Sequence, residues 1–249
     1  MNADSKFFLG RSESDMISVI TPAHNEADFI VDCLSSVSAA AKRISVPVEH
    51  IVVLNRCTDR TEAIAARYGA RLVRENAKNL SRIRNRGIAA SRGDIIVTID
   101  ADSRMTLNML AEVQKRIDSR KYIGGGVKVL PDRFSIGIFF SLLVAAPFIL
   151  REGVSAGMFW FRKKDFDAIG GFDENLVCVE DLDFGKRLKR YGKKSGKRYG
   201  TIWNEHIVTS CRKFDYFGDW FFIKHPGALY RILRRNPDQA KQFYYDPRS

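Results

Sequence analysis

Residues 93–102 read Gly-Asp-Ile-Ile-Val-Thr-Ile-Asp-Ala-Asp. The first two residues indicate a turn, and the β-branched apolar run 95–99 has the length and composition of a buried parallel strand. Asp100 and Asp102 follow at once, and residues two apart in an extended segment point the same way. Ligands of open α/β sheets bind beyond the carboxyl ends of the strands. The stretch therefore predicts a strand that carries two converging carboxylates into a binding site.

The two carboxylates predict a metal site. They repel each other unless a cation lies between them, and Mg²⁺ or Mn²⁺ prefers such oxygen ligands. The alternative is a solvated pair of aspartates in a loop, because an isolated Asp-x-Asp is a weak motif. The position at the end of a buried strand favours Asp100 and Asp102 as ligands of Mn²⁺ or Mg²⁺.

Composition indicates a globular protein with an ordinary core. The chain has 249 residues, of which 45% are hydrophobic and 28% charged. Its formal net charge of +12 predicts an anionic partner, which can be a nucleic acid, a membrane surface or a phosphorylated substrate. The four cysteines form no Cys-x-x-Cys pair, and residues 1–16 lack the apolar core of a secretory signal. We therefore expect a cytoplasmic protein without a disulfide framework.

The first hundred residues alternate between strand and helix patterns. We expect strands at 17–21, 48–54, 70–73 and 95–99, and helices at 61–68, at 80–91 and from a cap at Asn25 or Asp28. This alternation predicts an α/β fold with an open, mostly parallel sheet flanked by helices. No Gly-x-Gly-x-x-Gly follows the first strand, so a dinucleotide site is not expected.

The second half is less regular. We expect helices at 106–117, 163–169 and 180–191 and strands at 127–130 and 157–161, with the triple glycine 124–126 preceding a strand. No linker is evident, so 1–249 is one predicted domain. It divides into a nucleotide-binding type of half (16–103), a second half (104–212) and an aromatic, basic C-terminal segment (213–249).

Four polar sets fall at the predicted strand ends or beside them. They are residues 22–26, 55–59, 100–102, and the pair 180–181 that follows the Gly-Gly-Phe-Asp-Glu stretch 170–174. Over about residues 16–191 this arrangement resembles the family-two glycosyltransferases of the GT-A fold. The resemblance implies an inverting enzyme with a nucleotide-diphosphate sugar as donor, a UDP-sugar above all, and a nucleotide-sugar-binding half (16–103) followed by an acceptor half (104–212).

The resemblance also implies roles for individual residues of the donor site. Pro22, Asn25 and Glu26 match the loop that holds the nucleotide, and Asp59 matches the acid that accepts hydrogen bonds from the base or ribose. Arg82, with Asn85, lies where similar enzymes contact the donor, although a solvated basic helix face is the alternative.

In the acidic motif, the resemblance makes Asp102 the direct metal ligand and gives Asp100 either the ribose or a metal-bound water. Asp181 matches the general base that deprotonates the acceptor hydroxyl, and the alternative is a capping box at the start of the helix. His206 is a further candidate metal ligand, with a structural histidine as its alternative. Trp160 lines either the acceptor site or the core.

The acceptor is expected to be a sugar or a lipid-linked saccharide. A nucleotidyltransferase or a basic nucleic-acid-binding protein is the alternative function, although acids at strand ends would repel a nucleic acid without metal, so no nucleic-acid partner is expected. The uncharged stretch 134–150 predicts a buried or interfacial helix, with a buried core helix favoured. The basic block 186–198 and a basic amphipathic helix that begins near Phe214 suggest peripheral contact with the cytoplasmic face of a membrane.

Overall fold

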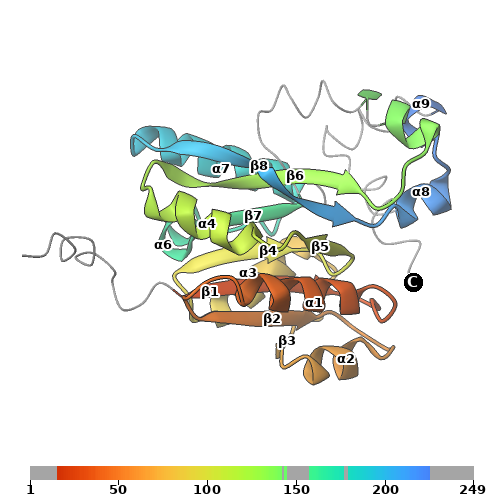
Figure 1. Ribbon diagram of the computed structural model, residues 1–249, viewed down its shortest axis with the longest axis horizontal. Coiled ribbons are helices and arrows are strands. Elements are labelled where there is room, and N and C mark those ends of the chain that lie inside the picture. Colours follow the sequence, from red (N-terminus) through yellow and green to blue (C-terminus); the bar gives the residue numbers. More distant parts are fainter. Residues whose placement is uncertain (1–15, 142, 145–156, 177–178, 225–249) are drawn as a thin grey trace, which may run out of the picture.

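The computed structural model describes residues 16–141, 143–144, 157–176 and 179–224. In these residues an eight-stranded sheet runs through both predicted halves, in the order β3-β2-β1-β4-β7-β6-β8-β5 (Figure 1). The strands are β1 (Ile17–Ala23), β2 (Val48–Leu54), β3 (Arg71–Arg74), β4 (Ile95–Ile99), β5 (Ser103–Met105), β6 (Tyr122–Pro131), β7 (Met158–Arg162) and β8 (Arg198–Thr209).

Helices cover both faces of this sheet. They are α1 (Ile30–Ala41), α2 (Thr61–Arg67), α3 (Leu80–Ala90), α4 (Met109–Asp118), α6 (Lys163–Ala168), α7 (Glu180–Lys194), α8 (Arg212–Phe217) and α9 (Phe221–Lys224). Residues 136–141 are also helical. The predicted α/β class with an open sheet and flanking helices is therefore confirmed.

The first four strands pair in parallel, as the alternating pattern predicts. The second half joins them through β7, which is antiparallel to both β4 and β6. β6 and β8 are parallel to each other, and β5 pairs antiparallel with β8. The two predicted halves thus share one sheet, and the carboxyl ends of β1, β2 and β4 lie at one edge of it.

Two apolar layers hold the helices to the sheet. One contains Cys33 and Val37 of α1 with Leu110 and Val113 of α4, packed against the strands. The layer on the other side of the sheet contains Ile83 and Ile88 of α3 and the aromatic rings of Phe161 in β7, Phe166 in α6 and Phe184 in α7, of which Phe161 and Phe166 stack. Burial of each such side chain contributes about 1.5–3 kcal/mol, which fixes the helices that carry the polar loops.

Three local expectations are wrong. Pro22 does not end the first strand, because β1 pairs with β4 only as far as Ile20 and the missing N–H of proline is not needed beyond it. Neither Asn25 nor Asp28 caps α1; instead the carbonyl of Glu26 accepts the N–H groups of residues 29 and 30. The glycines 124–126 lie inside β6 rather than before a strand.

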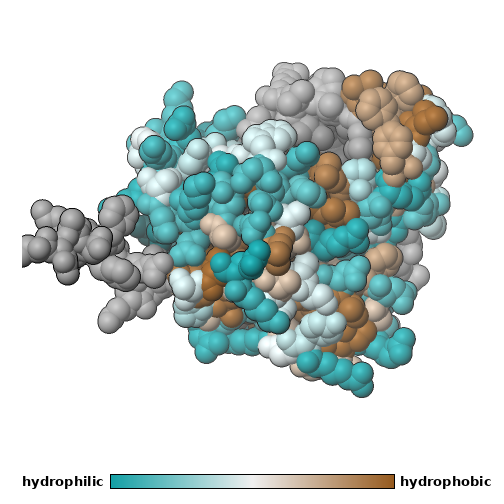
Figure 2. Space-filling view, in the orientation of Figure 1, coloured by the Kyte–Doolittle hydropathy of each residue, from teal (hydrophilic) through white to brown (hydrophobic). Residues whose placement is uncertain are grey.

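The apolar stretch at 134–150 is described only in part, since residues 142 and 145–150 lie outside the described ranges. Its helical part buries Ile138 and Ser141 but exposes Ile136, Phe139, Phe140 and Leu143, and Phe134 before the helix is exposed as well, so the favoured core helix is wrong there. Trp220 stacks on Phe140, and Figure 2 shows an apolar area at the upper right, over this helix, α8 and α9.

The predicted amphipathic helix from Phe214 is also wrong in the described range. α8 ends at Phe217, and Gly218 with φ of 86° separates it from α9. Residues 225–249 lie outside the described ranges. Among the residues that the structure describes, no helix combines the length and the apolar character needed to cross a membrane.

Candidate active site

Five carboxylates from distant parts of the chain meet at the edge of the sheet where β1 and β4 end. Glu26 follows β1, Asp100 and Asp102 follow β4, and Glu180 and Asp181 begin α7. Asp102 is further held by its carbonyl, which accepts the N–H of Ser210 after β8. Two arginines bind these five side chains in two groups.

Arg84 on α3 binds the first group. Its Nη2 donates to Asp100 Oδ1 at 3.0 Å, and its Nη1 donates to Glu180 Oε1 at 3.0 Å and to Asp181 Oδ1. The Arg84 side chain is only 2% exposed and lies over the ring of Phe172. A buried guanidinium is stable only when it is paired. Arg84 therefore fixes the candidate base Asp181 relative to the donor-side residue Asp100.

Burial and charge shift the titration of this group. Burial raises the pKa of Asp181, while Arg84 opposes the rise. Burial and the neighbouring Asp181 raise the pKa of Glu180 to about 7, again against the influence of Arg84. Burial works against the charge of Arg84, but Asp181, Asp100 and Glu180 hold its pKa above the ordinary value. A carboxylate with a raised pKa is a better proton acceptor, which suits a general base.

Arg212, the first residue of α8, binds the second group. Its Nη1 and Nη2 donate to the two oxygens of Glu26 at 2.6 and 2.8 Å, and Nη2 lies 2.9 Å from Asp102 Oδ2. The Asp102 side chain is 14% exposed and that of Glu26 only 4%. The carboxylate of Glu26, predicted to hold the nucleotide, thus faces Arg212.

The residues present fit a divalent cation. Five carboxylates share two guanidiniums, so the cluster keeps an excess of negative charge, and carboxylate oxygens suit Mn²⁺ or Mg²⁺. The described residues contain no group of three or more His, Cys, Asp or Glu side chains that could hold a metal ion. Asp102 and Asp100 would therefore hold the ion with further ligands from water and a diphosphate.

The structure does not bring His206 to Asp102. The strand register pairs Ser103 with Thr209, and His206 lies three residues further along β8, about 10 Å away. The carbonyl of His206 accepts hydrogen bonds from Thr106. Its role as a metal ligand stays a prediction.

The loops after β1 and β2 bind each other. Asn25 Oδ1 accepts the N–H of Thr58 at 2.8 Å, and the carboxylate of Asp59 accepts the N–H groups of Ala27 and Thr61. Burial works against the charge of Asp59, but these hydrogen bonds hold its pKa below the ordinary value. Pro22 is buried in β1 beside Val53. Asp59 itself is exposed at the loop and keeps lone pairs for a ligand.

Backbone strain is concentrated around these loops. In the described residues four non-glycine residues have positive φ, and three of them, Asn25, Arg56 and Val179, lie in the loops that carry the site. A β-branched residue such as Val179 rarely adopts this conformation. Strain of this kind is typical of functional sites, and here it directly precedes Glu180.

Arg82 and Asn85 behave differently from Arg84 on the same helix. The Arg82 side chain is 56% exposed and pairs with Glu75, outside the carboxylate group. Asn85 bonds the backbone of Phe172 and the carboxylate of Glu174, so it holds the Gly-Gly-Phe-Asp-Glu loop against α3. Trp160 is fully buried and donates to the carbonyl of Gly126, which places it in the core.

Sequence reasoning missed the two arginines. Arg84 stands at helical spacing from the buried residues Gly87 and Ile88, so a charge on the buried face of α3 is a usable signal. Arg212 gave no such signal, because its partner Glu26 is 186 residues away. The capping alternative for residues 180–181 is not observed, since α7 has no side-chain cap at Val179.

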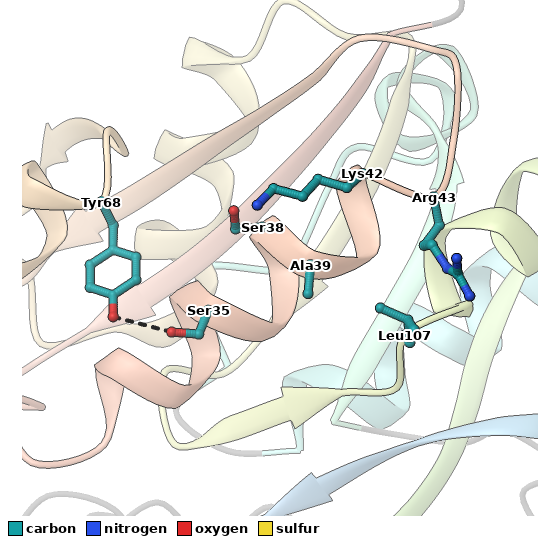
Figure 3. A pocket seen from close by; sticks show the side chains of 7 residues that line it. All are labelled: Ser35, Ser38, Ala39, Lys42, Arg43, Tyr68 and Leu107. Atoms are coloured by element: carbon teal, nitrogen blue, oxygen red, sulfur yellow. Dashed lines mark hydrogen bonds between the residues drawn. The ribbon is translucent and has the colours of Figure 1, made fainter.

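A second concave region lies away from these carboxylates. It is a hollow of about 500 Å³ against α1, lined by Ser35, Ser38, Ala39, Lys42, Arg43, Tyr68 and Leu107 (Figure 3). Its polar atoms include the Tyr68 hydroxyl, which bonds Ser35. None of the predicted site residues lines it.

Comparison with known proteins agrees with this geometry. A glucosyl-3-phosphoglycerate synthase from Mycolicibacterium paratuberculosis is 40% identical over 95 residues, which cover 34% of this chain and 28% of that protein. The chain spans less than half the length of the curated relatives it matches.

Two solved structures share the fold. That of TarS residues 1–349 from S. aureus in complex with UDP-GlcNAc has a TM-score of 0.62 at 18% identity, over 93% of this chain and 71% of that one. Glucosyl-3-phosphoglycerate synthase from Mycobacterium tuberculosis, in complex with Mn²⁺, UDP and phosphoglyceric acid, has a TM-score of 0.59 at 20% identity, over 87% and 78%. The family model of glycosyl transferase family 2 matches residues 18–170, well over half of the chain. The chain therefore belongs to glycosyltransferase family 2 and has the α/β fold of its glycosyltransferase relatives.

Proposed function

We propose that this glycosyltransferase is a metal-dependent, inverting enzyme that moves a sugar from a UDP-sugar to an acceptor hydroxyl in a single displacement. The observation that carries the proposal is the Arg84 hub, which holds a candidate base from α7 and a donor-side carboxylate from β4 on one guanidinium. Membership of the family argues against the nucleotidyltransferase and nucleic-acid-binding alternatives.

In the proposed reaction, the Asp181 carboxylate accepts the proton of the acceptor hydroxyl. The hydroxyl oxygen attacks the anomeric carbon as its bond to the diphosphate oxygen breaks, and the electron pair leaves with the nucleoside diphosphate. Attack from the face opposite the leaving group inverts the configuration. A divalent ion held by Asp102 and Asp100 would supply positive charge to stabilise the leaving diphosphate.

The donor and metal assignments draw support from the two related folds. TarS was solved with UDP-GlcNAc, and the mycobacterial synthase with UDP and Mn²⁺. In this chain, Asp59 would accept hydrogen bonds from a uracil or a ribose, which is supported by its exposure in the loop that it shares with Asn25. A contact of Arg82 with the donor phosphate stays a prediction, since its side chain is 56% exposed and pairs with Glu75.

We further propose a lipid-linked saccharide as acceptor and peripheral contact with the cytoplasmic face of a membrane. The exposed apolar area over residues 134–144, α8 and α9 supports this, since α8 begins at Arg212 in the carboxylate site. Acceptors carried on a lipid would reach the site from that side.

The test is product analysis with a panel of nucleotide sugars, following nucleoside diphosphate release and the anomeric configuration of the product by NMR. Asp102→Ala and excess chelator should each abolish turnover. Asp181→Asn should lower kcat by about 10²–10⁴, a typical general-base contribution, with donor affinity unchanged by calorimetry. Asp183→Asn, two residues further on α7 and paired with Arg187, is the matched control.

A retained anomeric configuration would overturn the inverting mechanism. Full activity of Asp102→Ala, or of the wild type in excess chelator, would overturn the metal assignment. Transfer of the nucleotidyl group with release of a sugar 1-phosphate, in place of a nucleoside diphosphate, would indicate a nucleotidyltransferase.

A further inference from the structure

Arg212 lies where the chemistry of the site calls for a metal ion. Its Nη2 lies 2.9 Å from Asp102 Oδ2. We propose that Arg212 is a tethered cation that occupies the Asp102 carboxylate in the ligand-free protein and is exchanged for the divalent ion. This inference rests on the metal site of the proposed function.

The positive charge of Arg212 substitutes for that of a metal ion. Converging carboxylates without a cation between them repel, and the guanidinium supplies the missing positive charge through charge-assisted hydrogen bonds. A divalent ion needs the same Asp102 oxygens, so guanidinium and ion compete for them. The Arg212 side chain is 22% exposed, in contrast to 2% for Arg84, so Arg212 is the one of the two that has a path toward solvent.

Glu26 gives Arg212 a second anchor from which this exchange can occur. Both guanidinium nitrogens Nη1 and Nη2 bond the Glu26 carboxylate, and the guanidinium also lies 4.8 Å from the centre of the Phe29 ring. The ion pair with Asp102 is made by Nη2, which also bonds Glu26. Release of Asp102 therefore leaves the bidentate pair with Glu26 intact, and the guanidinium stays beside the position where a diphosphate would bind.

The exchange links the metal site to the C-terminal helices. Arg212 is the first residue of α8, and the same short unit is tied to the rest of the protein through Arg133, which pairs with Asp215 and Asp219. Entry of a metal ion at Asp102 removes one of the contacts that hold the start of α8. Metal binding should therefore change the exposure of residues 212–224.

The test compares Mn²⁺ binding by electron paramagnetic resonance in the full-length wild type, Arg212→Gln and Arg104→Gln, without donor. Arg104 lies two residues from Asp102 but pairs with Asp32, so its replacement removes the same charge without touching the site. If Arg212 occupies Asp102 in nine of ten molecules, its removal should lower the Kd for Mn²⁺ by about tenfold, beyond any change in Arg104→Gln. A merely structural role predicts the opposite sign, because a disordered Asp102 binds metal more weakly.

A second readout is amide hydrogen exchange of residues 212–224, which should become faster on addition of Mn²⁺ to the wild type and not to Asp102→Ala. If Arg212→Gln binds Mn²⁺ as weakly as Arg104→Gln or more weakly, the exchange at Asp102 is overturned. The proposed metal-dependent transferase is not affected by that result as long as chelator still abolishes turnover. Absence of Mn²⁺ binding in every variant would overturn the exchange and the metal site together. Sugar transfer in excess chelator would then identify a metal-independent transferase.

Discussion

At the scale of single residues, Arg84 and Arg212 have different roles because they differ in burial. Arg84 is enclosed and contacts three carboxylates, so its charge is compensated only by an intact site. Removal of one partner from a buried ionic group leaves the others uncompensated, which costs more than the pair contributes. The carboxylates of Glu180 and Asp181 therefore depend on Arg84 for their ionised state.

We predict that Arg84→Met lowers the free energy of unfolding by about 3–5 kcal/mol at pH 8, where the three carboxylates would be left without a cation. The loss should be smaller at pH 5, because protonation of Glu180 removes one of the uncompensated charges. Urea denaturation at both pH values measures this. Arg82→Met, on the same helix but 56% exposed, should cost no more than about 1 kcal/mol. Equal losses of unfolding free energy in Arg84→Met and Arg82→Met would contradict the role of Arg84 as the shared partner of the three carboxylates.

Glu180 predicts a second pH effect. Its pKa is about 7 in the folded protein against an ordinary 4.5, so the folded state binds more protons than the unfolded state between these values. The resulting stability is fully present below pH 4.5 and is lost as the pH rises through 7. His50 acts in the opposite direction, because burial lowers its pKa from 6.5 to about 4 and stability rises with pH across that range.

The comparison of wild type with Glu180→Gln separates the two, since His50 is common to both proteins. The wild type should lose up to about 3 kcal/mol relative to Glu180→Gln between pH 5 and pH 8, given about 1.4 kcal/mol for each unit of pKa shift. Denaturation curves at four pH values measure the difference. Parallel pH profiles would show that Glu180 titrates normally.

The carboxylates of the site could be predicted from sequence, and their cations could not. Asp100, Asp102 and Asp181 stand in short motifs beside predicted elements. The ion pairs of Arg84 and Arg212 join residues that are up to 186 apart, so their partners depend on the tertiary fold. The strand register that separates His206 from Asp102 likewise depends on how β8 pairs with β5.

At the scale of elements, β6 shows why residue propensity alone does not place the glycines 124–126 inside a strand. Three consecutive glycines favour a loop, yet they form a central strand because β8 passes very close to them. A Cβ on Gly125 would lie 1.5 Å from the carbonyl oxygen of Gly200. By contrast, the predicted bounds of β2 and β4 are confirmed residue by residue, since β4 is a continuous β-branched run and β2 contains the β-branched run 51–53.

We predict that Gly125→Ala destabilises the protein by about 4 kcal/mol or more, because the backbone of β8 cannot move aside without breaking its ladder. Gly196→Ala is the control: a Cβ there meets nothing within 4 Å, and its φ of 69° alone should cost about 1–2 kcal/mol. The free energies of unfolding from urea titration compare the two. Similar losses in the two variants would contradict a steric clash between a Cβ at residue 125 and the backbone of Gly200.

At the scale of the whole molecule, the sheet separates two surfaces that sequence reasoning had assigned to one membrane contact. The basic block 186–198 ends at Arg198, where β8 begins, while α8 and the apolar area follow its other end (Figure 1). β8 is 12 residues long, so these ends lie about 35 Å apart at about 3.3 Å per residue. A flat membrane contact at the carboxylate site would therefore use the apolar area and not the basic block.

We predict that the wild type co-sediments with phospholipid vesicles and that Phe134→Ser combined with Ile136→Ser leaves it in the supernatant. These side chains are 76% and 65% exposed, and their burial in the interface is worth about 1.5–3 kcal/mol each, so the double change should weaken partitioning by more than tenfold. Leu107→Ser is the control for loss of an exposed apolar side chain elsewhere.

Lys193→Gln combined with Lys194→Gln tests whether the basic block 186–198 makes the membrane contact. If only the lysine variant releases the protein, and high salt does the same to the wild type, the contact lies at the basic end. Recovery of the wild type in the supernatant with anionic and neutral vesicles alike would remove the membrane contact, and the exposed aromatic side chains would then serve a different partner.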